Sequence, residues 1–316
     1  MDQIETRILP ASDTGVSQAV RILRAGGLVA FPTETVYGLG ADATNDRAVA
    51  GIFSAKSRPV FNPLIIHVAD MPTARRFALF NHAAEKLAQA FWPGPLSMVL
   101  PLNPSAGLSG LVTAGLETVA VRIPQNRLAK DLLARFGGAV AAPSANPSGR
   151  ISPTSVAHVL KGLSGKIDAV LDGGDCTVGL ESTIISPDKV PVLLRPGGLP
   201  AKVIEDYLGT KLAMLPSDAG LNAPGQMASH YAPQAMVRLN SRARIDGWLW
   251  LGFGPDCQGA DLNLSPSGDL TEAAINLFSH LHQLDAINTP IAIAPIPMQG
   301  LGLAINDRLK RAATVR

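Results

Sequence analysis

The sequence predicts an α/β (α+β) fold in two domains: a larger domain with a twisted mixed sheet and helices, and a small C-terminal Rossmann-like α/β domain. Short apolar runs typical of buried strands alternate with amphipathic stretches typical of helices along most of the chain. The 316 residues exceed the ~250 at which a single hydrophobic core stops growing. A stretch rich in Pro, Gly, Ser and Asn, at about residues 209–233, interrupts the pattern.

The first elements lead into a polar loop. Residues 14–25 have an amphipathic helical pattern that stops at a pair of glycines, and residues 28–31 have a buried strand pattern that ends at Pro32. The same criteria predict, in order, helix 46–56, strand 64–68, helix 73–91, strands 96–100 and 118–123, helix 126–136, strand 139–142, helix 153–162, strands 169–171, 182–186 and 192–194, and helix 200–208.

The C-terminal part repeats this alternation on a smaller scale. Its predicted elements are strand 246–253, helix 270–284, strand 290–294 and helix 301–313. We therefore expect a first domain over residues 1–208, a linker over 209–235 and a small α/β domain over 236–316.

Composition excludes several classes of function. Charged residues make up 16% of the chain, against ~25% in typical soluble domains, so function must depend on a few placed charges. A net charge of +2 with no basic run argues against a general binder of nucleic acids or membrane surfaces. Cys176 and Cys257 form neither a metal pair nor a disulfide framework, which indicates a reducing compartment. Without a signal-peptide pattern or an apolar run of ~18 residues, we expect a cytoplasmic protein.

Two polar blocks, residues 56–64 (KSRPVFNPL) and 143–149 (PSANPSG), crowd charged, amide and hydroxyl groups between prolines. A residue before proline is driven out of the helical region, so both blocks are expected to be extended and rigid. In such a stretch Lys56 and Arg58 project to the same side, and offer an ammonium and a forked guanidinium to a polyphosphate.

The second block repeats this spacing with neutral donors. Ser144 and Asn146 can fix a phosphate or a ribose without adding charge. A solvated loop of turn-forming residues would explain either block alone. The presence of both in one chain favours an anion pocket.

Further polar side chains leave other predicted strands. Residues 31–40 place threonines and a glutamate on a loop after a strand, where open sheets bind ligands, and Arg195 follows another strand. Arg122 lies within an apolar strand and needs an anionic partner; a structural salt bridge and a substrate carboxylate both remain open. His67, at a strand end, is a candidate pocket residue, whereas the six histidines form no metal-binding pattern.

Taken together, these blocks resemble the YrdC-like family in its long, two-domain form. The likeness is dense over residues ~14–208, and it extends to His230-Tyr231-Ala232-Pro233, a tetrapeptide characteristic of the long form. The blocks that carry it, in the order of the family, are residues 31–40, 56–64, 91–97, 121–124, 143–149, 181–183 and 194–198.

The resemblance implies a nucleotidyltransferase (adenylyltransferase) with a twisted sheet and a positively charged concave face. Such an enzyme joins L-threonine, bicarbonate or CO2, and ATP into threonylcarbamoyl-adenylate, and releases diphosphate. Its product feeds the N6-threonylcarbamoyladenosine (t6A) modification of tRNA through the downstream threonylcarbamoyl-transferase machinery. We expect Mg2+ to arrive on the ATP phosphates, with no metal held by side chains, no organic cofactor, no membrane and no stable binding of nucleic acid.

The resemblance also implies roles for individual residues. Lys56 and Arg58 are expected to be catalytic, by holding anions in line and neutralising charge as it develops. Tyr231 and the linker could fold over the pocket as a lid that excludes water. The expected ATP-binding residues are Lys56, Arg58, Asn62, Thr118, Ser144, Asn146, Ser152, Arg195 and Tyr231. The expected threonine-binding residues are Thr33, His67, Arg122, Ala142 (through its backbone) and Ser182.

Two alternatives remain. The positively charged concave surface of this family could accept double-stranded RNA, although the small net charge weighs against it. A carbamoyl-adenylate-forming enzyme of the hydrogenase-maturation type is the nearest rival among enzymes. Those proteins carry acylphosphatase-like and zinc-finger segments, for which this chain has neither the length nor the cysteines.

Overall fold

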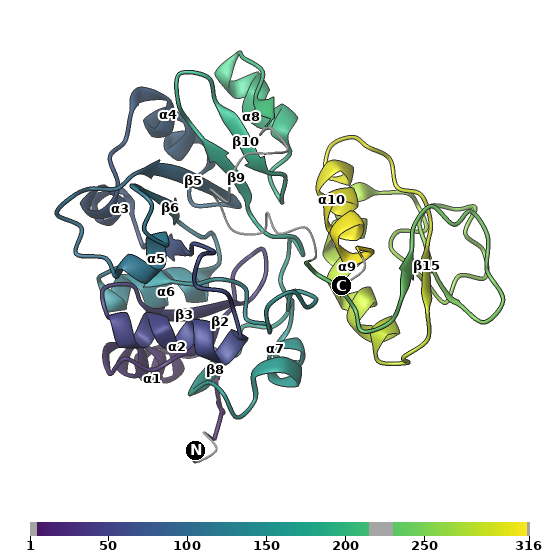
Figure 1. The fold of residues 1–316 in the computed structure, drawn as a ribbon, viewed down its shortest axis with the longest axis horizontal. Helices are drawn as coiled ribbons and strands as arrows, with labels where there is room; N and C mark the ends of the chain where they lie inside the picture. Colours follow the sequence, from purple (N-terminus) through teal and green to yellow (C-terminus); the bar gives the residue numbers. More distant parts are fainter. Residues whose placement is uncertain (1–4, 215–229, 315–316) are drawn as a thin grey trace.

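The structure, a computed structural model, describes residues 5–214 and 230–314. Two sheets organise the chain (Figure 1). The larger has eleven strands in the order β1-β8-β2-β3-β7-β4-β6-β5-β9-β10-β11. Its strands are β1 (Arg7–Leu9), β2 (Val29–Phe31), β3 (Gly38–Asp42), β4 (Ile65–His67), β5 (Leu96–Pro101), β6 (Thr118–Arg122), β7 (Val140–Ala141), β8 (Ala169–Leu171), β9 (Thr183–Ser186), β10 (Val192–Arg195) and β11 (Ala213–Met214).

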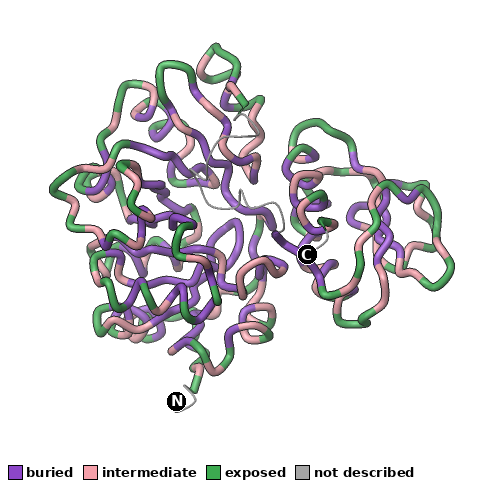
Figure 2. Tube along the Cα trace, viewed as in Figure 1, coloured by how far each residue is buried: buried purple, intermediate pink, exposed green. Residues whose placement is uncertain are grey.

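Helices cover both faces of this mixed sheet. On β2, Val29 and Phe31 pack with α1 (Asp13–Arg24) and α6 (Arg127–Phe136), whereas Ala30 between them packs with α2 (Asp46–Lys56). This is the alternation expected of a strand buried on both sides. Figure 2 shows the buried residues concentrated along the strands. The other helices of this domain are α3 (Met71–Phe77), α4 (His82–Phe91), α5 (Gly110–Thr113), α7 (Val156–Leu163) and α8 (Ala201–Leu208).

The second sheet is small and wholly parallel, in the order β12-β15-β13-β14. Its helices, α9 (Leu270–Asp285) and α10 (Gly302–Ala312), lie between this sheet and the first domain (Figure 1). One apolar cluster therefore crosses the boundary, and joins Leu180 and Tyr231 to residues of both helices. The strands are β12 (Val237–Arg238), β13 (Leu249–Gly252), β14 (Leu262–Asn263) and β15 (Ile291–Ile293).

The two-domain α/β prediction is confirmed, but some elements differ from it. The single helix over 73–91 is wrong: Ala78 is extended and bridges to Leu102, and Asn81 caps a new helix by accepting a hydrogen bond from the Ala84 N–H. The polar loop that starts at Pro32 is shorter than expected, because β3 begins at Gly38. The shortest strands and α5 carry too few residues to show a periodic pattern.

The expected linker over 209–235 lies partly outside the described residues, which resume at His230. Among the described helices, none combines the length and the hydrophobicity needed to cross a membrane.

Candidate active site

A pocket opens where several strands of the larger sheet end. His67 and Arg122 are paired in register at the carboxyl ends of the parallel strands β4 and β6, and Arg195 ends β10. The walls of the pocket are completed by the segment that leads into β3, the segment that follows β7, the loop between α2 and β4, the segment that leads into β9, and the chain just before the second domain. The lining residues are Thr33, Thr35, Val36, Gly38, Arg58, Ile65, His67, Arg122, Ala142, Pro143, Ser144, Glu181, Ser182, Arg195, His230 and Tyr231.

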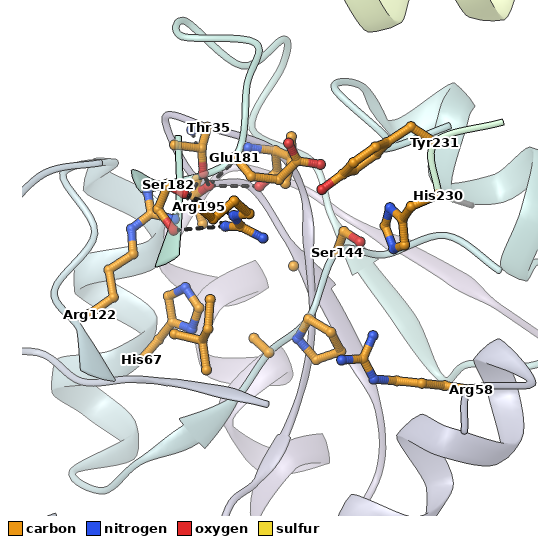
Figure 3. A pocket seen from close by; sticks show the side chains of 16 residues that line it. Thr35, Arg58, His67, Arg122, Ser144, Glu181, Ser182, Arg195, His230 and Tyr231 are labelled. Carbon is orange, nitrogen blue, oxygen red and sulfur yellow. Dashed lines mark hydrogen bonds between the residues drawn. The ribbon is translucent and has the colours of Figure 1, made fainter. Parts of the chain in front are cut away.

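The pocket has two sides with Arg195 between them (Figure 3). Arg122 and His67 lie on one side. Arg58 and Ser144 lie on the other, near His230 and Tyr231, which precede the second domain. Most of the residues that the sequence predicted are thus brought together. The exceptions are Lys56, Asn62, Thr118, Asn146 and Ser152, which are not among the lining residues.

Arg58 is held by the loop that it begins. Its Nε and Nη2 donate to the Asn62 carbonyl at 3.3 and 3.2 Å, and Nη2 also donates to the Pro63 carbonyl at 2.9 Å. Burial lowers the pKa of Arg58 to about 10, so the guanidinium is charged at neutral pH. The Asn62 side chain is buried beside this loop.

The expectation that Lys56 and Arg58 project to the same side from an extended segment is wrong. Lys56 is the last residue of α2, Ser57 after it is in the left-handed conformation with φ 49°, and so Lys56 and Arg58 do not project together from an extended segment. The buried ammonium donates to the carbonyls of Ser144 and Asn146. Lys56 therefore ties the two polar blocks to each other, and burial lowers its pKa well below the usual value.

Asn146 and Ser152 also support the pocket from behind. The Asn146 amide donates to the Pro147 and Arg150 carbonyls, at 3.1 and 2.8 Å, and so closes its own turn. The Ser152 hydroxyl donates to Glu181 Oε1 at 2.5 Å. Thr118 lies at the opposite end of β6 from Arg122, about 13 Å away at ~3.3 Å per residue.

On the other side, Arg122 has protein partners of its own. Nη2 donates to Glu34 Oε1 at 2.6 Å, Nη1 to Thr35 Oγ1 at 2.9 Å, and Nε to the Gly94 carbonyl at 3.2 Å. The structural salt bridge that the sequence left open is therefore present. Of the five N–H groups of a guanidinium, these bonds leave two for a ligand.

Apart from the Glu34 carboxylate, the polar side chains near Arg122 are neutral. Burial, assisted by the Arg122 charge, lowers the pKa of His67 to about 3, so the imidazole is neutral at physiological pH. The Ser182 hydroxyl lies 2.8 Å from Ser97 Oγ, and Thr33 Oγ1 donates to the Val36 carbonyl at 2.6 Å.

Arg195 joins the two sides. Its Nη2 donates to the Ser182 carbonyl at 2.8 Å and to Ser182 Oγ at 3.2 Å, and burial lowers its pKa. The nearby His230 has a strongly lowered pKa, first because it is buried and then because Arg58, Lys56, Arg195 and Arg308 surround it. The charged groups that act on His230 are thus cations, although the chain carries a net charge of only +2.

Sequence reasoning missed Glu181, His230 and Thr35 as members of the pocket, although all three lie within blocks that carried the resemblance. A strand exit or a tetrapeptide motif marks a segment, but it does not show which side chain faces the cavity. Within the two described ranges, no group of three or more His, Cys, Asp or Glu side chains is arranged to hold a metal ion.

The chain matches two family models that together span both domains. Residues 21–197 match the model of the Sua5, YciO and YrdC proteins, which is described as "Telomere recombination". Residues 199–314 match a model described as "Threonylcarbamoyl-AMP synthase, C-terminal domain".

Similar proteins cover nearly the whole chain. The threonylcarbamoyl-AMP synthase of Pyrococcus abyssi is 40% identical over 94% of this chain and 94% of its own length. That of Bacillus subtilis is 41% identical over 96% of this chain and 94% of its own. The crystal structure of P. abyssi Sua5 complexed with L-threonine matches with a TM-score of 0.89 at 38% identity, and the match covers 98% of both chains.

Proposed function

The chain belongs to the Sua5, YciO and YrdC family in its two-domain threonylcarbamoyl-AMP synthase form, and we propose that its pocket joins ATP, L-threonine and bicarbonate or CO2. The resemblance drawn from the sequence is thereby confirmed. The chain is an adenylyl-transferring enzyme of t6A formation, as the shared name implies. The residues that hold each substrate, and the magnesium that accompanies ATP, are part of the proposal.

The observation that carries the assignment of substrates is the two-sided pocket. One side has a forked cation, Arg122, whose contacts with Glu34, Thr35 and Gly94 leave two N–H groups, and it has neutral polar side chains beside it. This suits an amino acid with one carboxylate and one hydroxyl. The other side has Arg58 with Arg195 next to it, which suits the phosphates of a nucleotide.

On the amino-acid side, the two remaining N–H groups of Arg122 would bind the threonine carboxylate. The neutral His67 and the Ser182 hydroxyl line the same pocket, and would exchange hydrogen bonds with the threonine amine and hydroxyl. The neutral imidazole would accept a hydrogen bond from the threonine amine. The charge of Arg122, which also acts on His67, would lower the pKa of that amine and so favour the unprotonated form needed as a nucleophile.

The reaction then needs no covalent enzyme intermediate. The threonine nitrogen attacks the carboxyl donor and loses a proton, which leaves as water with the departing oxygen of bicarbonate, or is released when CO2 is the donor. The product, N-carboxy-threonine, has a new carboxylate oxygen that attacks the α-phosphorus of ATP while diphosphate leaves. Arg58 and Arg195 would stabilise the charge on the phosphates, together with the Mg2+ that ATP carries. Lys56 would contribute indirectly, because its hydrogen bonds hold the segment of Ser144 and Asn146 against the end of α2.

Diphosphate release from ATP tests this proposal when threonine and bicarbonate are supplied together or singly. We expect release only when all three substrates are present. Release without threonine would contradict the proposal. Salt-sensitive binding to double-stranded RNA without any ATP turnover would instead favour the RNA-binding alternative.

A further inference from the structure

Arg308, on α10 of the second domain, reaches into the first domain and contacts a residue that lines the pocket. Its Nε donates to Glu181 Oε2 at 2.8 Å, and its Nη1 donates to Asp307 Oδ2 at 2.7 Å. The side chain is 0% exposed. Its Nη2 is buried and has no hydrogen-bond partner among the described residues. Because Glu181 belongs to the first domain and Arg308 to the second, their contact exists only when the two domains are docked.

Glu181 stands out because it is an acid in a pocket of cations. Burial alone would raise its pKa, but Arg308 and Arg195, with hydrogen bonds from Ser152 and Arg308, lower it below the usual value. Glu181 is therefore a carboxylate at neutral pH. Both of its oxygens are occupied, one by the Ser152 hydroxyl at 2.5 Å and the other by Arg308.

Arg308 also contacts Tyr231, another residue of the pocket lining. The guanidinium carbon lies 5.1 Å from the centre of the Tyr231 ring, and Phe278 of α9 stacks on the same ring at 5.7 Å. The Tyr231 hydroxyl is buried in the pocket wall and has no hydrogen-bond partner among the described residues. Two elements of the second domain thus hold an aromatic residue whose polar end faces the ligand side.

We propose that Arg308 is a positioning residue of the active site, which cancels the charge of Glu181 and holds Glu181 and Tyr231 in the pocket wall near Arg195 (Figure 3). This inference rests on the proposed function, because it assigns the ATP phosphates to the Arg58 and Arg195 side. An uncompensated carboxylate there would repel a polyphosphate. The second domain therefore contributes to ATP binding without supplying a group that touches the reacting atoms.

If the salt bridge between Arg308 and Glu181 served only to join the domains, its loss would have different effects. Loss of either partner would then destabilise the protein, and neither loss would change the affinity for ATP in a particular direction. If Arg308 compensates Glu181, the two single variants must act in opposite directions. Arg308→Gln leaves a carboxylate facing the phosphates, whereas Glu181→Gln leaves an additional cation.

Direct binding of ATP and of L-threonine to the full-length protein, measured by calorimetry without turnover, tests this inference. The variants are Arg308→Gln, Glu181→Gln and the double variant, with thermal unfolding of each to confirm folding. Lys310→Gln is the matched control, since it removes a cation from the same helix at an exposed position. The binding readout also separates this inference from the proposed function, because it does not depend on which product is formed.

We expect Arg308→Gln to raise the Kd for ATP about tenfold, and Glu181→Gln to lower it by about threefold or more. The double variant and Lys310→Gln should stay within about threefold of the unmodified protein, and the Kd for threonine should change little in all of them. If Arg308→Gln does not fold, the isosteric Glu181→Gln still decides the question. Weaker or unchanged ATP binding in Glu181→Gln, or equal losses of ATP and threonine binding in folded Arg308→Gln, would overturn the inference.

Discussion

Arg122, which lines the pocket, forms a buried ion pair with Glu34, with Arg122 Nη2 2.6 Å from Glu34 Oε1 and side chains that are 4% and 5% exposed. The second Glu34 oxygen accepts the Gln125 N–H at 3.0 Å. The charge of Arg122 is therefore balanced before any substrate arrives. A threonine carboxylate would find a guanidinium that is already oriented, which reduces the entropy lost on binding.

Replacement of Arg122 by lysine should impair threonine binding selectively. An ammonium keeps the charge, but it cannot reach Glu34, Thr35 and the Gly94 carbonyl together and still present a fork. We expect the KM for threonine to rise about tenfold or more, with the KM for ATP within about threefold. Steady-state kinetics with each substrate varied in turn would measure this, and Arg75→Lys, at an exposed ion pair with Glu85, is the matched control. A parallel rise in both KM values would argue against the assignment of Arg122 to threonine.

Replacement of Lys56 by methionine should lower stability as well as activity. The variant leaves the Asn146 carbonyl without its buried donor, and leaves the Ser144 carbonyl with the Asn146 N–H in place of two donors. An unsatisfied buried acceptor costs roughly 1–3 kcal/mol. We expect the free energy of unfolding in urea to fall by about 1–3 kcal/mol on this basis. Lys86→Met, at an exposed position on α4, should change it little. A variant of full stability that has lost ATP binding would show instead that Lys56 acts on the phosphates directly.

The histidines at the domain boundary should make stability depend on pH. His282 of α9 stacks on His158 of α7 with ring centres 3.9 Å apart, and burial followed by repulsion from His158 lowers the pKa of His282 to about 3. The unfolded chain takes up a proton near its ordinary pKa of ~6.5, while the folded protein does not until about pH 3. Stability therefore falls as the pH drops between these values, by up to about 1.4 kcal/mol per pH unit for this group.

Urea unfolding of the unmodified protein and of His282→Asn, at several values between about pH 7 and pH 4, would check this linkage. His282→Asn should lose less stability on acidification, because its unfolding should take up nearly one proton fewer than that of the unmodified protein. His82→Asn, at the exposed start of α4, is the control with the same substitution. Equal slopes for His282→Asn and the unmodified protein would mean that His282 is not buried in its neutral form.

Discrimination between amino acids should follow the polar lining on the Arg122 side. If His67 or Ser182 pairs with the threonine hydroxyl, valine would leave that partner buried without a hydrogen bond. We expect kcat/KM for valine to be lower by about 10⁴, and that for serine, which lacks one methyl group, by only about 10–200-fold. Competition assays with equimolar amino acids would measure both ratios. Efficient use of valine would show that the pocket does not recognise the threonine hydroxyl.

The sequence predicted those parts of the fold and the site that depend on local pattern. Helix 46–56 has the predicted bounds because Asn45 caps it and its apolar spacing is regular. The polar blocks were recognisable because prolines and polar side chains recur at short spacing.

Pairings between distant parts of the chain were not predictable in this way. Arg122 and Glu34 are 88 positions apart, and Arg308 and Glu181 are 127 apart, so no window of sequence contains either pair. The side chain of Lys56 projects differently from that of Arg58 because Ser57 between them adopts the left-handed conformation and ends the helix. The role of Thr118 in ATP binding, which only the resemblance implies, stays a prediction. Thr118 lies at the far end of β6 from Arg122.

In the proposed reaction, one pocket joins a carboxyl group from bicarbonate or CO2 to the threonine nitrogen and then to the α-phosphate of ATP. The most direct measurement is mass spectrometry of the product formed from ATP, threonine and carbon-13-labelled bicarbonate. We expect threonylcarbamoyl-AMP that carries the label, formed together with an equal amount of diphosphate, and its strong reduction in Arg58→Ala. An adenylate without the label, or diphosphate release with no threonine in the product, would contradict the proposed reaction.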